Sequence, residues 1–274
     1  MSNPPLAQAD LQKTKQTPTE VTPEQSLVAF INKPAMKNQL AAALPRHMTA
    51  DRMIRIVTTE IRKNPELASC SQQSFIGAVV QCSQLGLEPG NALGHAYLLP
   101  FKKNKKNQQT GKWEVASIDV QLIIGYRGMI DLARRSGQIV SISARTVRQG
   151  DNFHFEYGLN ESLTHVPGED EESPITHVYA VARLKDGGVQ FEVMTHSQIE
   201  KVRASSKAGE NGPWKDYWEE MAKKTVIRRL FKYLPVSIEM QKAVILDEKA
   251  EANVDQENAS VFEGEFEEVG SNGN

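Results

Sequence analysis

The sequence predicts an α+β fold in which helices precede and follow an antiparallel sheet. Apolar residues recur at helical spacing before residue 86, and strand-like runs separated by turn residues occupy most of residues 95–195. Helical spacing returns between residues 196 and 246. Strict alternation of strand and helix does not occur, which argues against a doubly wound nucleotide-binding sheet.

Four helices are predicted in the first third of the chain, at residues 25–31, 36–43, 49–63 and 71–85. Pro45 ends the second helix, Thr49 is a suitable N-cap for the third, and Gly86 stops the fourth. Cys82 lies on the apolar stripe of the fourth helix. We expect it and Cys70 to be reduced and structural, with a regulatory disulfide as the alternative.

The middle of the chain reads as strands. A hairpin is predicted from residues 95–101 and 115–125, joined by the basic loop KKNKKNQQTGKW, and a short helix follows at 126–136. Four further strands are expected at residues 138–148, 152–158, 176–184 and 189–195. The last two flank Lys-Asp-Gly-Gly, a sequence that readily forms a tight turn. Residues 159–174, which contain GEDEES, are expected to form a loop.

Helices return at the end of the chain. Thr195 is the expected N-cap of a helix over 196–205, and Pro213 stands at the first position of the next one. The segment WKDYWEEMAKKTVIRRLFKYL, residues 214–234, is expected to form one amphipathic helix. A final helix is predicted at residues 236–246.

The helix expected at 214–234 has a basic face. At 100° per residue, its apolar side chains gather on one side, and on the other lie Lys224, Arg228, Arg229 and Lys232, with Trp214 and Tyr217. Cations and aromatic rings on one surface neutralise phosphates and stack bases. A solvated face with the tryptophans in the core is the alternative. A helix on a membrane surface is a third interpretation.

Charge is unevenly distributed along the chain. Residues 1–27 are polar and proline-rich, and residues 247–274 hold nine acidic residues and one lysine. We therefore expect a disordered N-terminal segment, an acidic disordered tail and a core over residues 28–246. Because the whole chain carries −2, the tail −8 and the first segment −1, the core carries +7. A basic core suits a protein that holds a polyanion.

Other basic positions support this interpretation. The loop between the hairpin strands contains Lys103 and Lys105, and Tyr126 and Arg127 lie between two glycines that let a backbone approach a ligand. Arg145 and Arg148 share a predicted strand, and Lys207 lies in the loop before Trp214. Each of these features also occurs in proteins without such a role, so the prediction depends on their combination.

Several kinds of chemistry have no motif in this chain. We find no phosphate-binding loop, no pair of cysteines at zinc spacing and no nucleophile elbow. A metal-dependent nuclease needs converging carboxylates, and Asp119, Asp131 and Glu156 are candidates only because they lie near strands. No apolar run is long enough to span a membrane. The first residues lack the apolar centre of a signal peptide, so we expect a cytoplasmic protein.

Five long blocks of the sequence resemble the RecT family, in particular its prophage-encoded members from enteric bacteria. The blocks lie within residues 28–246 and read LAAALPRHMTADRMIRIVTTEIRK, QCSQLGLEPGNALGHAYLLPF, VQLIIGYRGMIDLARRSGQI, THVYAVARLKDGGVQFEVMT and NGPWKDYWEEMAKKTVIRRLFKYLPVSIE. The resemblance implies a single-strand annealing protein. Such proteins pair complementary DNA strands without ATP, promote strand invasion and assemble into rings or helical filaments.

The resemblance also implies partners and a fold. The expected partners are single-stranded DNA, further copies of the chain and a 5′–3′ exonuclease, and a host single-strand binding protein is a candidate. The expected core is a hairpin and an antiparallel sheet packed on a long helix. No cofactor is expected, and a need for Mg²⁺ stays open. Passive coating of single strands without annealing is the main alternative.

Residue roles follow from residue type within this framework. Phosphate contacts are expected mainly from Arg127, Arg148, Lys223, Lys224, Arg228 and Arg229. Tyr126 is expected to pack against a sugar or a base. Further candidates are Lys207, Trp214, Lys232, Lys103 and Lys105.

Overall fold

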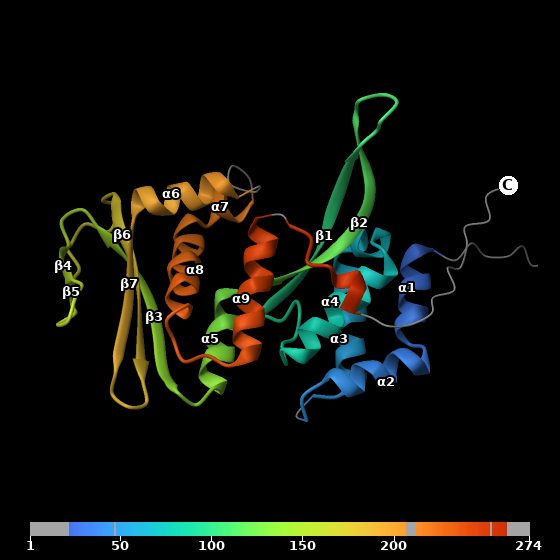
Figure 1. The fold of residues 1–274 in the computed structure, drawn as a ribbon, viewed down its shortest axis with the longest axis horizontal. Helices are drawn as coiled ribbons and strands as arrows, with labels where there is room; N and C mark the ends of the chain where they lie inside the picture. The colour runs from blue at the N-terminus through green and yellow to red at the C-terminus, as the bar shows by residue number, and fades with distance from the viewer. Residues whose placement is uncertain (1–21, 47, 207–211, 253, 262–274) are drawn as a thin grey trace, which may run out of the picture.

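The structure is a computed structural model that describes residues 22–46, 48–206, 212–252 and 254–261. Over these residues it confirms a mixed α+β fold with antiparallel sheets. Figure 1 shows helices around a long hairpin at one end of the molecule and a three-stranded sheet at the other. Helices α5 (Tyr126–Arg135) and α9 (Ile238–Glu251) lie between the two ends, where α9 contacts β2 and α5 contacts β3.

The N-terminal end consists of α1 (Pro23–Ile31), α2 (Pro34–Ala43), α3 (Ala50–Lys63), the 3-10 helix η1 (Pro65–Ser69) and α4 (Gln72–Gln84). The four predicted helices are confirmed, with small differences at their ends. The Thr49 hydroxyl accepts the Arg52 N–H at the start of α3, as its capping role requires. Because α1 begins at Pro23 behind a Thr22 capping box, the prediction of disorder up to residue 27 is wrong at residues 23–27.

Strands β1 (Ala96–Lys106) and β2 (Trp113–Ile124) form the hairpin, which projects away from the helices (Figure 1). Pairing continues to Lys106 opposite Trp113. The expected basic loop is therefore wrong at both ends, and its lysines lie mostly on β1. The turn itself is held by Asn107, whose side-chain oxygen accepts the Gln109 and Thr110 N–H groups at 2.8 and 3.1 Å.

The sheet at the other end has the order β3-β6-β7, with β3 (Ile139–Arg148), β6 (Ile175–Leu184) and β7 (Val189–Thr195) all antiparallel. Strands β4 (Asn152–Glu156) and β5 (Ser162–Val166) pair only with each other. The predicted loop at 159–174 therefore contains a strand. Its side chains alternate between half-buried and exposed, and the half-buried ones join a small aromatic cluster on the outer face of the sheet.

The remaining helices are α5 (Tyr126–Arg135), α6 (His196–Ser205), α7 (Pro213–Asp216), α8 (Trp218–Phe231) and α9 (Ile238–Glu251). The single helix expected at 214–234 is wrong, because Tyr217 leaves the helical conformation between α7 and α8. Trp214 is buried in the core, whereas the Trp218 indole N–H donates to Glu200 of α6 at 2.6 Å. Trp214 therefore anchors α7 in the core, and Trp218 anchors the start of α8 against α6. Helix α8 packs on the sheet.

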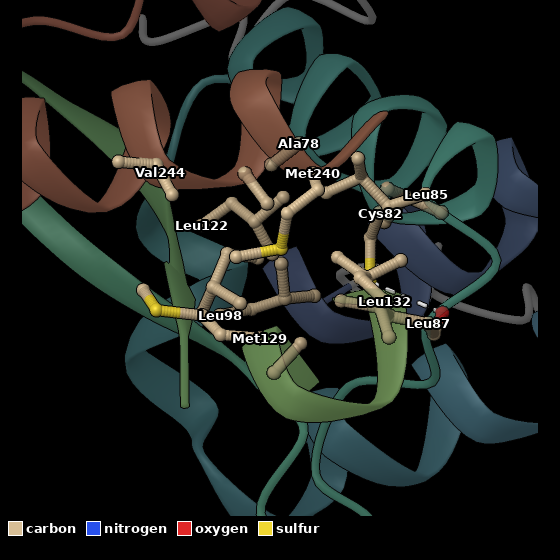
Figure 2. Packing of buried hydrophobic residues seen from close by; sticks show 14 of the residues in the cluster. Ala78, Cys82, Leu85, Leu87, Leu98, Leu122, Met129, Leu132, Met240 and Val244 are labelled. Atoms are coloured by element: carbon tan, nitrogen blue, oxygen red, sulfur yellow. Dashed lines mark hydrogen bonds between the residues drawn. The ribbon is translucent and has the colours of Figure 1, made fainter. Parts of the chain in front are cut away.

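One continuous core joins the two ends. Figure 2 shows Leu98, Leu122, Met129 and Met240 packed together, which brings β1, β2, α5 and α9 into contact. Cys82 lies in the same region, and its thiol contacts the Leu87 carbonyl oxygen at 3.2 Å. Both cysteines are free and buried, as predicted, and burial raises the pKa of Cys70 to about 12.

The chain from residue 254 to residue 261 forms a strap, here called the C-terminal strap, across α4 and the edge of β2. The Gln256 amide accepts the Leu122 N–H and donates to the Leu122 carbonyl, both at 2.8 Å, so it covers the edge as a neighbouring strand does. The prediction of a disordered tail from residue 247 is therefore wrong for 247–252 and 254–261.

Candidate nucleic-acid interface

The basic face expected to meet solvent lies against α9 instead. Lys224 donates to Asp247 at 2.6 Å, and Arg228 pairs with Asp247 at 3.1 Å and with Glu251. The side chain of Asp247 is 1% exposed, and that of Arg228 is 10% exposed. Burial opposes the charge of Arg228, but the two carboxylates outweigh it and raise its pKa. These ions join two helices, so the structure does not support phosphate contacts by Lys224 and Arg228.

The cause of this difference is visible in the sequence of α9. Asp247, Glu248 and Glu251 recur at helical spacing, as do Lys224, Arg228 and Lys232 on α8. Two helices with complementary stripes pack with their charges facing. Lys232 accordingly pairs with Glu248 at 3.0 Å. The acidic composition from Asp247 onward predicts a disordered tail instead, and that prediction hides the complementarity of the two helices.

Two other expected contacts also change. Arg229 pairs with Glu192 of β7 at 2.7 Å. Trp214 is 1% exposed and is therefore a core residue, so stacking of a base on its ring, as the sequence suggested, is excluded for this conformation. Lys207 lies outside the described residues.

The start of α5 holds Tyr126 and Arg127 at the surface. A Cβ on Gly128 would lie 2.2 Å from the His95 carbonyl oxygen, and one on Gly125 would lie 2.0 Å from that of Gly94. Glycines at these positions let the chain before β1 pack directly on the helix. The Arg127 guanidinium is exposed, and its Nε donates to the Tyr126 hydroxyl at 3.3 Å.

A chain of charges connects Arg127 to β3. The hydroxyl of Tyr126 donates to Glu220, and Glu220 accepts from Lys223 at 3.0 Å. Lys223 also lies 3.9 Å from Glu219, which pairs with Arg148 at 2.7 Å. The structure thus brings together four predicted site residues, Tyr126, Arg127, Lys223 and Arg148, which come from three elements.

Two hollows flank this chain of charges. One, of about 400 Å³, is lined by His95, Arg127 and Arg134 among others. The other, of about 410 Å³, is lined by Arg145, Arg148 and Lys223 together with the acidic segment 170–172. We call the set Arg127, Arg134, Lys223, Arg145 and Arg148 the cationic strip. Arg134 was missed because a single arginine at the end of a short helix carries no motif.

The second hollow has a fixed wall. Asp151 accepts the Arg148 and Gly168 backbone N–H groups, both at 2.7 Å, and lies 2.9 Å from His165 Nε2. These bonds lower the pKa of Asp151 to about 2. His165 Nδ1 in turn lies 3.1 Å from the Tyr179 hydroxyl. The network ties the β4–β5 hairpin to the sheet, next to Arg148.

The hairpin lysines divide into two kinds. Lys103 pairs with Asp119 of β2 and Asp255 of the C-terminal strap, each at 2.5 Å, so it is a structural cation. Lys105 is exposed and makes no ion pair with the part of the chain that the structure covers. It lies near the tip of the hairpin, opposite Glu114, and the next residue, Lys106, lies opposite Trp113, which is 70% exposed. This second basic surface stands apart from the cationic strip.

The carboxylates considered for metal binding have other partners. Asp119 binds Lys103, Asp131 pairs with Arg135, and Glu156 lies by His154. Among the described residues, no three histidine, cysteine or acidic side chains are grouped so as to hold a metal ion. The same residues include no helix with the length and apolar character needed to cross a membrane.

Comparison with known proteins identifies the family. A model of the RecT family matches residues 51–261, which includes the C-terminal strap. The chain is 66% identical to Protein RecT of Escherichia coli strain K12 over 264 residues, or 96% of each chain. It is 30% identical to the uncharacterized protein YqaK of Bacillus subtilis strain 168 over 191 residues, or 69% of this chain and 61% of that one. The chain therefore belongs to the RecT family of DNA-binding recombination proteins, a membership that implies annealing of single strands.

Proposed function

We propose that the chain binds single-stranded DNA along the cationic strip and anneals it to a complementary strand without ATP. The strip carries this proposal, because its cations come from α5, α8 and β3 and line two adjacent hollows. Arginine and lysine contacts to phosphates position a strand without reading its sequence. The bases stay available, so complementarity is read by base pairing itself. Pairing also supplies the free energy.

The family resemblance extends the proposal to the assembly, the partner and the location of the protein. We infer that copies of the chain assemble into rings or filaments, that a 5′–3′ exonuclease supplies the single strand and that the protein also promotes strand invasion, all in the cytoplasm. The residues that the structure describes between 22 and 261 form a longer core than the sequence suggested, and this core is the unit proposed to bind DNA. The matched family region supports its C-terminal limit.

The test is an annealing assay with two complementary dye-labelled oligonucleotides and no ATP. Energy transfer follows pairing, and a denaturing gel checks that the strands stay intact. Pairing faster than the spontaneous rate is the expected result. Binding should also weaken with salt, with a slope of about −0.7 per neutralised phosphate. Tight binding without faster pairing would indicate a coating protein, and shortened strands would indicate a nuclease.

A further inference from the structure

Two carboxylates stand in the middle of the cationic strip. Glu219 and Glu220 open α8 and pair with Arg148 and Lys223. A DNA phosphate is drawn to the same two cations, so phosphate and carboxylate compete for one set of donors. We propose that Glu219 and Glu220 act as an electrostatic brake on strand binding, which a phosphodiester backbone must displace. This inference rests on the proposed function and names its regulation.

The exposure of the partners shows which of them is free to move. The side chains of Arg148 and Lys223 are 25% and 24% exposed, and those of Glu219 and Glu220 are 40% and 47% exposed. Arg148 is held further because its Nη1 donates to the Ser173 carbonyl at 2.8 Å. Arg148 therefore keeps one contact when Glu219 leaves, and the two carboxylates are more exposed than the cations, so they reach solvent by a rotamer change. A phosphate replaces them without rebuilding the site.

A brake suits annealing for a physical reason. A strand must be held firmly enough to stay extended, yet it must slide while the second strand searches for its register. Exposed ion pairs are weak and exchange readily. Intramolecular carboxylates that return to Arg148 and Lys223 each time a phosphate leaves keep the contacts short-lived.

The experiment compares binding of a fluorescent single-stranded oligonucleotide to the full chain and to Glu219→Gln and Glu220→Gln. Each variant should bind about two- to fivefold more tightly, through slower dissociation. Glu248→Gln is the matched control, because Glu248 is 42% exposed and pairs with Lys232 at 3.0 Å away from the strip. It adds the same charge and should change affinity by less than about 1.5-fold. Circular dichroism checks that the variants fold.

A double-mutant cycle identifies the cations through which the carboxylates act. Glu219→Gln should give a much smaller gain when Arg148→Gln is already present, because its other strip cation, Lys223, lies 3.9 Å away. Glu220→Gln should give no gain beside Lys223→Gln. Equal gains in all three single variants would reduce the effect to net charge and overturn the brake. Unchanged or weaker binding by Glu219→Gln and Glu220→Gln would also overturn it, the latter by showing that the carboxylates position the cations. If the full chain fails to bind the oligonucleotide, both the proposed function and the electrostatic brake are overturned.

Discussion

At the scale of single residues, arginine has two different roles in this protein. Arg228 lies between α8 and α9 with two carboxylates, and Arg127 lies exposed at the start of α5. The sequence correctly indicated a cationic stripe on α8, because helical phase follows from spacing alone. It did not indicate what faces the stripe, because that depends on the packing of α9. Arg127, Lys223 and Arg148 were proposed as phosphate contacts by residue type, and their proximity follows only from tertiary structure.

Arg228→Ala should therefore destabilise the fold. It leaves Asp247, 1% exposed, with Lys224 as its remaining partner, and it strips Glu251 of its cation. We expect the free energy of unfolding in urea to fall by about 3 kcal/mol. Lys232→Ala breaks an exposed pair and should cost less than about 1 kcal/mol. Equal stability of Arg228→Ala and the unmodified chain would show that the network contributes little.

The pKa of Asp151, about 2, predicts a pH dependence. An unfolded aspartate has a pKa of about 3.9, so the folded chain binds fewer protons in this range. The stabilisation is complete above about pH 4 and is lost as the pH falls through about 2. Asp151→Asn should lower the free energy of unfolding at neutral pH. It should also make that free energy fall less steeply between about pH 4 and about pH 2. Urea unfolding at several pH values measures this, with exposed Glu161→Gln as the control. If the stability of Asp151→Asn fell with pH as that of the unmodified chain does, the low pKa assigned to Asp151 would be contradicted.

At the scale of elements, most helices and strands were predictable because capping residues and periodicity act locally. Thr49 and Thr195 cap helices as the sequence suggested. The predictions from sequence were wrong where contacts between residues far apart in the chain determine the local structure. The break at Tyr217 depends on where Trp214 and Trp218 find partners. The C-terminal strap is polar and acidic, so its composition suggested disorder, whereas Gln256 is ordered by the edge of β2.

Gly77→Ala tests the strap as an element. A Cβ at position 77 would lie 1.7 Å from the Asn258 carbonyl oxygen, so the strap must move away from α4. Overpacking of this kind costs about 1–3 kcal/mol. We expect a lower midpoint of thermal unfolding and faster hydrogen exchange of the Leu122 amide, which donates to Gln256. Unchanged protection of that amide would show that the strap is not held there.

At the scale of the whole molecule, the charges separate into layers. Lys224 and Arg228 are neutralised by buried Asp247 between α8 and α9, and the cationic strip lies where α5, α8 and β3 meet. An excess of cations between residues 28 and 246 could be predicted from the charge distribution, although α9 and the C-terminal strap add Asp247, Glu248, Glu251, Asp255 and Glu257 to the folded core. The location of the cationic surface could not, because that requires knowing which cations find acidic partners.

The most direct test of the strip is crosslinking of a single strand to introduced thiols. Cys70 and Cys82 are 6% and 0% exposed, so an added cysteine is the reactive one. Arg134→Cys and Arg145→Cys place a thiol in each hollow. Asn38→Cys, exposed on α2, is the control, and Lys106→Cys reports on the hairpin. An oligonucleotide with thiol-reactive groups on its phosphates should couple to both strip positions and leave Asn38→Cys unlinked. Coupling at Lys106→Cys with none at either strip position would contradict the account.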